Sequence, residues 1–311
     1  MTELIGNAAA RAEFAGVAAG SALHHAWLIA GPQGVGKASF ARAMAAQLLG
    51  TTVDNAMIAA GSHPDYRELK RLPKDTEKPD QDLARSIPIA QIRGLLPMFA
   101  TRPTYSERRV IVIDAIDDVE RPGASNALLK SLEEPPAGTI FLLVSHAPSR
   151  LLPTIRSRCR VLRFAGLADD EVAQVIARAM PTAGEAEVAA LVAVAGGSPG
   201  RALGFAGLDL AGIDRALGAI AQSGDPSNAA RSALAKALGG KAAQLRYELF
   251  LERAPRFIAD RARQSAGGAL KQALDLYDAA RSLAGSARGL SLDPQATVYE
   301  MAGLVAALPR G

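Results

Sequence analysis

The chain has 311 residues, which is enough for two or three domains that each bury a core. Hydrophobic residues make up 49% of it, which excludes an intrinsically disordered protein, and no apolar run is long enough to cross a bilayer. The formal net charge of +4 permits contact with nucleic acid without arguing for it.

Cysteine and histidine usage limits the possible chemistry further. Cys159 is the single cysteine, which excludes an internal disulfide and fits a reducing cytoplasm. Residues 1–14 lack the basic-then-apolar layout of a secretory signal, so we expect a cytoplasmic protein without membrane contacts. We also expect no metal site, because the histidines show no ligand spacing: His24, His25, His63 and His146.

The N-terminal half alternates short apolar runs with helical patterns. Residues 26–30 predict a strand that ends in a glycine-rich loop, and residues 38–49 predict a helix with one apolar face. Further buried strands are expected at 108–118, 139–145 and 160–164, with helices at 89–99 and 123–134. This alternation predicts a parallel sheet with right-handed crossovers.

Strand signals end after Phe164, and the rest of the chain is predicted to be helical. Three short helices are expected at 168–180, 184–195 and 198–206, followed by longer stretches at 209–222, 226–238, 241–266, 268–287 and 293–308. The predicted layout is therefore an α/β core at 1–165, a small helical module at 166–207 and a larger all-α domain at 208–311.

The glycine-rich loop GPQGVGK resembles a phosphate-binding loop with one residue replaced. Gly31, Gly36 and Lys37 fit the pattern of Gly, four residues, Gly, Lys and then Ser or Thr, but Ala38 stands in the hydroxyl position. That hydroxyl normally holds Mg²⁺. Ser39 is one helical residue further round, about 100° away, so it cannot simply substitute.

A second motif for nucleotide hydrolysis is also incomplete. Asp114 ends an apolar strand and would bind Mg²⁺ through water, although a lone strand-end Asp is also a common turn residue. Ala115 stands where a glutamate would orient the attacking water, and Asp117 and Asp118 are predicted to lie in a loop. We expect a degenerate site that binds ATP or ADP weakly or not at all, with these candidate residues: Gly31, Gly34, Gly36, Lys37 and Asp114.

Several segments together indicate a family: GPQGVGK, HPDY at 63–66, SNALLKSLEEPP at 125–136, IRSRC at 155–159 and SPGRAL at 198–203. From about residue 5 to 206 the chain resembles the delta-prime family of bacterial DNA polymerase III clamp-loader subunits, which are AAA+ relatives of the gamma/tau motor subunit. The resemblance implies an AAA+ P-loop core, a three-helix lid and a helical collar that joins the subunits into a ring.

The resemblance also assigns a role to the Ser-Arg-Cys segment. Arg158 would be an arginine finger that reaches ATP held by the neighbouring motor subunit, while Ser157 and Cys159 would be structural. Without the resemblance, Arg158 is more simply a solvated arginine, since Arg156 and Arg160 stand beside it.

Three departures from the family pattern change the expectations. Many relatives carry four cysteines that form a zinc module, but residues 50–62 contain none, so we predict no zinc. Gly200 takes the position of the arginine that senses the γ-phosphate in the motor subunit, with Arg201 one residue later. Ser145 follows the third strand, where a polar sensor normally lies, but a serine there is also a common turn residue.

The function implied by the resemblance is that of a non-motor clamp-loader subunit. Its partners would be the gamma/tau and delta subunits, with the sliding clamp and primed DNA contacted through the complex. An active gamma-type ATPase remains an alternative if Lys37, Asp114 and Ser39 suffice for turnover. A DNA-binding module is another, with basic residues that are otherwise a solvated helix face: Arg253, Arg256, Arg261 and Arg263.

Overall fold

The computed structural model describes residues 4–18, 20, 23–51, 56–74 and 83–309. They form two compact units, of which the first contains Met1–Arg178 with Gly196–Arg201 and the second Ala179–Ala195 with Ala202–Gly311. The boundary between the units falls within the predicted small helical module at 166–207. The division into three domains therefore stays a prediction.

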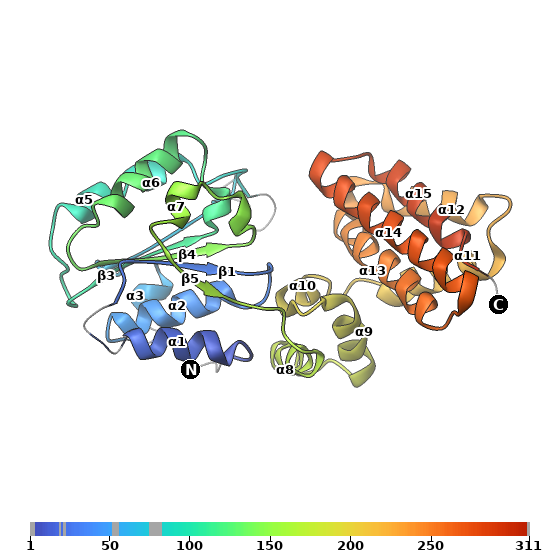
Figure 1. The fold of residues 1–311 in the computed structure, drawn as a ribbon, viewed down its shortest axis with the longest axis horizontal. Coiled ribbons are helices and arrows are strands. Elements are labelled where there is room, and N and C mark those ends of the chain that lie inside the picture. Colours follow the sequence, from blue (N-terminus) through green and yellow to red (C-terminus); the bar gives the residue numbers. More distant parts are fainter. Residues whose placement is uncertain (1–3, 19, 21–22, 52–55, 75–82, 310–311) are drawn as a thin grey trace. The chain divides into compact units, whose positions relative to one another are not determined.

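The first unit contains a parallel five-stranded sheet in the order β2-β3-β4-β1-β5 (Figure 1). The strands are β1 (Ala26–Ala30), β2 (Tyr66–Lys70), β3 (Arg109–Asp114), β4 (Thr139–Ser145) and β5 (Arg160–Arg163). Every neighbouring pair is parallel. The central strands β1 and β4 are buried along their whole length, as their continuous apolar sequences predict.

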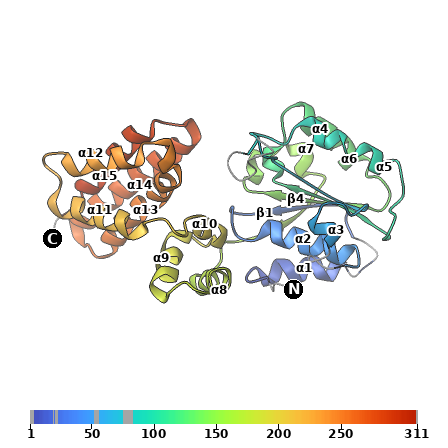
Figure 2. The same cartoon turned by 180° about the vertical axis from the view of Figure 1, so that it is seen from behind.

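Helices cover both faces of this sheet (Figures 1 and 2). On one face lie α1 (Ala8–Ala18), α2 (Lys37–Leu48) and α3 (Ala56–Ala59). On the other lie α4 (Ile89–Arg93), α5 (Leu96–Phe99), α6 (Gly123–Glu133) and α7 (Pro153–Arg156), which are labelled in Figure 2. The second face holds a large apolar core that includes Leu28, Ile113, Leu128, Phe141 and Ile155. The predicted fold class, an α/β P-loop core followed by helical regions, is confirmed.

The second unit is helical. It contains α9 (Glu185–Ala195), α11 (Leu210–Ser223), α12 (Ala229–Leu238), α13 (Gln244–Arg263), α14 (Gly267–Leu290) and α15 (Pro294–Ala306). Helix α13 packs mainly against α14, and α12 packs against α15. Two further helices lie at the boundary of the units, α8 (Asp169–Ala179) and α10 (Pro199–Gly204). A helix forms in every stretch predicted to be helical beyond residue 208.

Three elements differ from the sequence prediction. Strand β2 was not predicted, because at this edge of the sheet only Tyr66 and Leu69 are buried and the charged residues between them hide the pattern. The strand predicted at 108–118 ends at Asp114 and is followed by a 3₁₀ turn, η1 (Ile116–Asp118). The single helix predicted at 89–99 is divided into α4 and α5.

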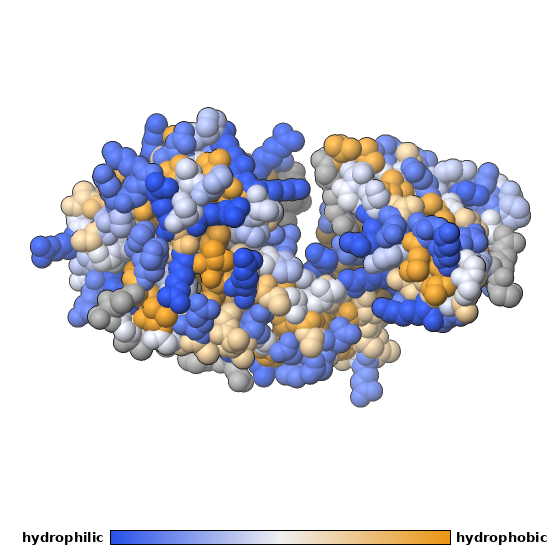
Figure 3. All heavy atoms as spheres, viewed as in Figure 1, coloured by the Kyte–Doolittle hydropathy of each residue, from blue (hydrophilic) through white to orange (hydrophobic). Residues whose placement is uncertain are grey.

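The surface view in Figure 3 shows hydrophilic side chains interspersed with smaller apolar groups on both units. Among the residues that the structure describes, the most exposed large apolar side chains belong to Leu96, Tyr105 and Leu290. Within the described ranges, no helix is long and apolar enough to span a membrane.

Candidate functional site

The predicted phosphate loop follows β1 and leads directly into α2, in the strand–loop–helix order that the motif requires. Gly34 and Gly36 have φ angles of +83° and +95°, a region that residues with a Cβ rarely adopt. Gly36 is also the N-cap of α2. The loop is joined to the sheet because the Gly31 N–H donates to the carbonyl oxygen of Ser145 at 3.2 Å.

Lys37 folds back onto the loop that carries it. Its side chain is buried, with 3% exposed, and Nζ donates to the carbonyl oxygens of Gly31 and Pro32 at 2.7 and 2.5 Å. Burial lowers the pKa of Lys37 to about 8, against the opposing effect of the Asp114 and Asp117 carboxylates. A bound phosphate would have to replace these two hydrogen bonds.

Asp114 ends β3, as predicted, but it has a partner that the motif did not reveal. Nη2 of Arg42, on α2, lies 3.3 Å from Asp114 Oδ2 and 2.6 Å from Glu68 Oε1. Burial raises the pKa of the Asp114 carboxyl, and the Arg42 guanidinium partly offsets that rise. The predicted Mg²⁺-binding carboxylate is thus part of an ion-pair cluster with Arg42 and Glu68.

Alanine occupies two positions at which the hydrolysis motifs usually have a hydroxyl and a carboxylate. Ala38 is half-buried, Ser39 is exposed and Ala115 is buried. Asp117 lies in η1, and its carboxylate accepts hydrogen bonds from the Ser145 hydroxyl at 3.1 Å and the His146 N–H at 2.7 Å. Asp117 therefore fixes the carboxyl end of β4.

The SPGRAL segment packs directly on the phosphate loop. The Gly200 N–H donates to the carbonyl oxygen of Gly34 at 2.9 Å. A Cβ added to Gly34 would lie 2.8 Å from the Arg201 backbone nitrogen, and a Cβ added to Gly200 would lie 3.0 Å from the Gly34 Cα. The two glycines are needed for this close approach of backbones.

Arg158 lies near the amino ends of the parallel strands, whereas this loop lies at their carboxyl ends. It precedes β5, in which Arg160 is paired with Trp27 at the start of β1 and Arg163 with Ala30 at its end. Parallel strands rise about 3.3 Å per residue, so the phosphate loop begins roughly 13 Å beyond the level of Arg160. Arg158 therefore cannot reach the phosphate loop of its own chain.

The Arg158 guanidinium is held by two neighbours. Nη2 lies 2.6 Å from Glu133 Oε1, and Nη1 donates to the Thr154 carbonyl oxygen at 2.9 Å. The side chain is 34% exposed, so the solvated arginine expected from the sequence alone is replaced by a half-buried, ion-paired one. Next to it, Ser157 Oγ also donates to Thr154, and burial raises the pKa of the Cys159 thiol to about 12.

The HPDY segment has a structural role, because it binds a distant loop through the Asp65 carboxylate. The Asp65 carboxylate is fully buried and accepts hydrogen bonds from the backbone N–H groups of Thr104, Tyr105 and Ser106 at 2.7, 2.6 and 3.1 Å. Burial acts to raise the pKa of Asp65, but these three donors outweigh it and lower the pKa. The segment thus anchors the loop that leads into β3.

The basic residues of the DNA-binding alternative have intramolecular partners. Arg253 is ion-paired with Asp214 and Asp260, at 2.6 and 3.2 Å. Arg263 also pairs with Asp260 at 3.1 Å, and Arg256 donates to the Ala193 carbonyl oxygen. The Arg261 guanidinium lies 5.4 Å from the centre of the Phe257 ring. These contacts favour a structural use of the four arginines.

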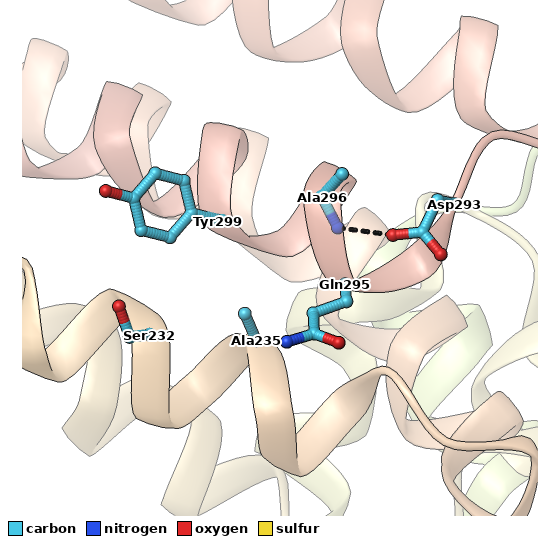
Figure 4. A pocket seen from close by; sticks show the side chains of 6 residues that line it. All are labelled: Ser232, Ala235, Asp293, Gln295, Ala296 and Tyr299. Atoms are coloured by element: carbon cyan, nitrogen blue, oxygen red, sulfur yellow. Dashed lines mark hydrogen bonds between the residues drawn. The ribbon is translucent and has the colours of Figure 1, made fainter.

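A groove of about 350 Å³ lies between α12 and α15 in the helical unit (Figure 4). It is lined by Ser232, Ala235, Asp293, Gln295, Ala296 and Tyr299. The Asp293 carboxylate accepts a hydrogen bond from the Ala296 N–H at 2.8 Å and caps α15. None of the candidate site residues lines this groove.

No cluster of three or more His, Cys, Asp or Glu side chains in the part of the chain that the structure describes is arranged to hold a metal ion. Residues 50–62, for which the sequence predicts no zinc module, lie partly outside the described residues. The absence of zinc therefore stays a prediction from the sequence.

The strand, glycine-rich loop and following helix, placed on a parallel sheet, define a P-loop fold. The chain belongs to the family described as DNA polymerase III, delta subunit, whose match spans residues 6–168.

Individual relatives agree with this assignment. The chain is 39% identical over 193 residues to the DNA polymerase III subunit delta' of Pseudomonas aeruginosa, covering 58% of this chain and 55% of that protein. It is 33% identical to the corresponding subunit of Escherichia coli, with 58% and 54% covered. The chain thus spans about half the length of the curated relatives it matches.

Solved structures are also similar to this chain. A gamma subunit-related protein of DNA polymerase III from Thermotoga maritima has a TM-score of 0.45 at 13% identity, with 97% of this chain and 99% of that one covered. The RuvB Holliday junction branch migration motor of the same organism has a TM-score of 0.48 at 16% identity, with 96% and 87% covered.

Proposed function

We propose that the chain is a non-motor, delta-prime-type subunit of a clamp loader, and that Arg158 completes the nucleotide site of a neighbouring ATPase subunit. The observation that carries this proposal is the position of Arg158 before β5, at the opposite end of the strands from its own phosphate loop. Its partners in the hetero-oligomer are gamma/tau and delta subunits. The sliding clamp and primed DNA are contacted through the assembled complex.

The chain's own nucleotide site is proposed to be inactive. Lys37 is bonded to its own loop and Asp114 is paired with Arg42, so both groups must leave a partner before they can serve a nucleotide. Ala38 and Ala115 lack the metal-binding hydroxyl and the water-orienting carboxylate. ATP or ADP would bind weakly and would not be hydrolysed.

A finger in trans gives such a subunit a role in turnover. A guanidinium stabilises the negative charge that spreads over the phosphoryl oxygens in the transition state, and it stays protonated at any physiological pH. When the guanidinium belongs to a neighbouring chain, turnover depends on assembly. The helical region from about residue 208 would join the subunits, although most apolar residues of α13 are already buried within its own unit.

The proposal is tested with complexes reconstituted from wild-type chain or the Arg158→Ala variant. An arginine finger contributes roughly 10³ to 10⁵ in rate at its own site, and a ring with several sites loses less in total. We expect clamp- and DNA-stimulated ATPase activity and clamp loading to fall, while assembly is unchanged. Equal activity of wild-type and Arg158→Ala complexes would remove the proposed mechanism.

Arg156→Ala is the matched control, because Arg156 is exposed and ends α7, two residues before Arg158. We expect it to leave turnover close to the wild-type value. The gamma-type alternative is tested separately with the isolated chain. Robust ATPase activity that Lys37→Ala abolishes would favour that alternative.

A further inference from the structure

The LEEPP and SRC segments, far apart in the sequence, meet in one ion pair between Glu133 and Arg158. We propose that Glu133 is a positioning residue for Arg158, which holds the guanidinium in place for a neighbour's phosphate. This inference rests on the proposed function of Arg158. It gives the LEEPP segment a role in the activity of the adjacent site.

The contacts of Arg158 leave donors available while the pair is intact. A guanidinium has five N–H groups, and the strong contacts use one on Nη2 for Glu133 and one on Nη1 for Thr154. A weaker contact of Nη1 with the Ser157 hydroxyl, at 3.5 Å, is at the limit of a hydrogen bond. At least two N–H groups therefore remain for phosphate oxygens.

Both partners of Arg158 are attached to the apolar core of the first unit. Glu133 is the last residue of α6 and follows Leu132, which is 1% exposed. Thr154 lies in α7 and precedes Ile155, which is 3% exposed. Because these neighbours are packed in the core, the backbone at Glu133 and Thr154 is fixed, and with it the Thr154 carbonyl oxygen. The Glu133 carboxylate is 47% exposed and is held by its ion pair with the guanidinium.

Two effects of Glu133 on a neighbour's phosphate oppose each other. Its negative charge reduces the field of Arg158, but both groups are partly exposed and such fields are screened by water and salt. Against this, a free arginine side chain loses much rotamer freedom when it binds, and a guanidinium that is already held loses less. We infer that orientation is the larger effect at this half-exposed site.

The test compares Glu133→Gln with Glu134→Gln in reconstituted complexes with active motor subunits. Glu134 is exposed, next in sequence and matched in chemistry. We expect Glu133→Gln to lower kcat for ATP by about two- to fivefold, the rate equivalent of a partly exposed ion pair, with KM little changed. Glu134→Gln should leave both values unchanged.

A double-mutant cycle shows whether Glu133 acts through Arg158. In the Arg158→Ala background, Glu133→Gln should have no further effect on kcat. A similar loss in both backgrounds, or a rise in kcat for Glu133→Gln alone, would overturn the inference and leave the finger role intact. If Arg158→Ala does not itself reduce turnover, the proposed function fails, and the inference fails with it.

Thermal unfolding of the isolated chain completes the test. The pair is partly exposed, so Glu133→Gln should shift the unfolding midpoint little while it changes kcat. A large loss of stability with a parallel fall in assembly would mean that Glu133 stabilises the fold and does not position Arg158. That result would overturn the inference.

Discussion

The backbone N–H of Gly200 donates a hydrogen bond to the carbonyl oxygen of Gly34, 2.9 Å away. This bond places the start of α10 on the middle of the phosphate loop. It explains why both segments need glycine at the contact, since a Cβ on either residue would lie within about 3 Å of the other backbone. The contact with α10 therefore stabilises the conformation of the phosphate loop.

We expect Gly200→Ala to destabilise the chain by about 1–3 kcal/mol, the usual range for forcing extra atoms into a well-packed contact. The added Cβ would lie 3.0 Å from the Gly34 Cα and 3.1 Å from its carbonyl oxygen. Urea unfolding followed by circular dichroism measures the change in the free energy of unfolding.

The control is Gly204→Ala, in the same helix. Gly204 is exposed, and a Cβ there would meet no atom within 4 Å. Alanine has the higher helix propensity, so this variant should be neutral or more stable by up to about 1 kcal/mol. Equal losses for the two variants would show that the close approach to Gly34 is not the cause.

A second prediction concerns the pH dependence of stability at Lys37, whose pKa is lowered from 10.5 to about 8 by burial. Below about pH 8 the amine is protonated in both the folded and the unfolded chain, so the cost of burying the charge is fully present. Between about 8 and 10.5 the folded chain releases its proton first, and stability rises with pH. Above that range the contribution is constant.

The variant Lys37→Met keeps the length of the side chain and removes the charge. Relative to this variant, the wild type should gain on the order of 2–3 kcal/mol as the pH rises from 7 to 10.5, the free-energy equivalent of the pKa shift. Lys130→Met, at an exposed position on α6, is the control and should show a flat difference. A flat difference for Lys37→Met as well would contradict the lowered pKa.

Much of the fold can be read from the sequence because it depends on burial. The strands predicted at 26–30 and 139–145 are β1 and β4, whose apolar residues are buried on both faces. Strand β2 could not be read in the same way. At the edge of the sheet, only two of its five residues are buried, and the local pattern resembles a polar loop.

Only the parts of the site that consist of consecutive residues could be predicted from the sequence. The loop at Gly31 to Lys37 and the strand end at Asp114 are local motifs, and they were found. The Arg42 and Glu133 contacts depend on how distant elements pack, and a charged residue on a helix carries no signal of its partner. Long-range ion pairs of this kind are therefore invisible to motif analysis.

A third prediction concerns the buried Asp65 carboxylate and the three backbone N–H groups that donate to it. Asp65→Asn removes the charge and places an amide before three backbone N–H donors, so we expect a loss of about 2–4 kcal/mol at pH 7. Because the pKa of Asp65 is lowered in the folded chain, its contribution is complete above the unfolded value of about 3.9. It is lost as the pH falls further, through the folded pKa.

Urea unfolding at several pH values between 7 and 3 measures this difference. Asp170→Asn is the control, because Asp170 is an exposed residue in the first turn of α8. Its replacement should cost no more than about 1 kcal/mol, the usual value of a charge at a helix N-terminus. A wild-type advantage over Asp65→Asn that does not shrink below pH 4 would mean that the hydrogen bonds do not depend on the ionised carboxylate.

The last prediction separates a structural from a DNA-binding role for the arginines of α13. Arg253 is 13% exposed and pairs with Asp214 and Asp260, whereas the Arg263 side chain is 79% exposed. Arg253→Ala should therefore lower the free energy of unfolding by about 1–2 kcal/mol, and Arg263→Ala by less than about 0.5.

Each arginine that binds a DNA phosphate adds about one to the slope of log affinity against log salt concentration. We expect both variants to leave that slope unchanged when the reconstituted complex binds primed DNA. A slope reduced by about one in each variant, with stability unchanged, would instead support direct DNA binding by this helix.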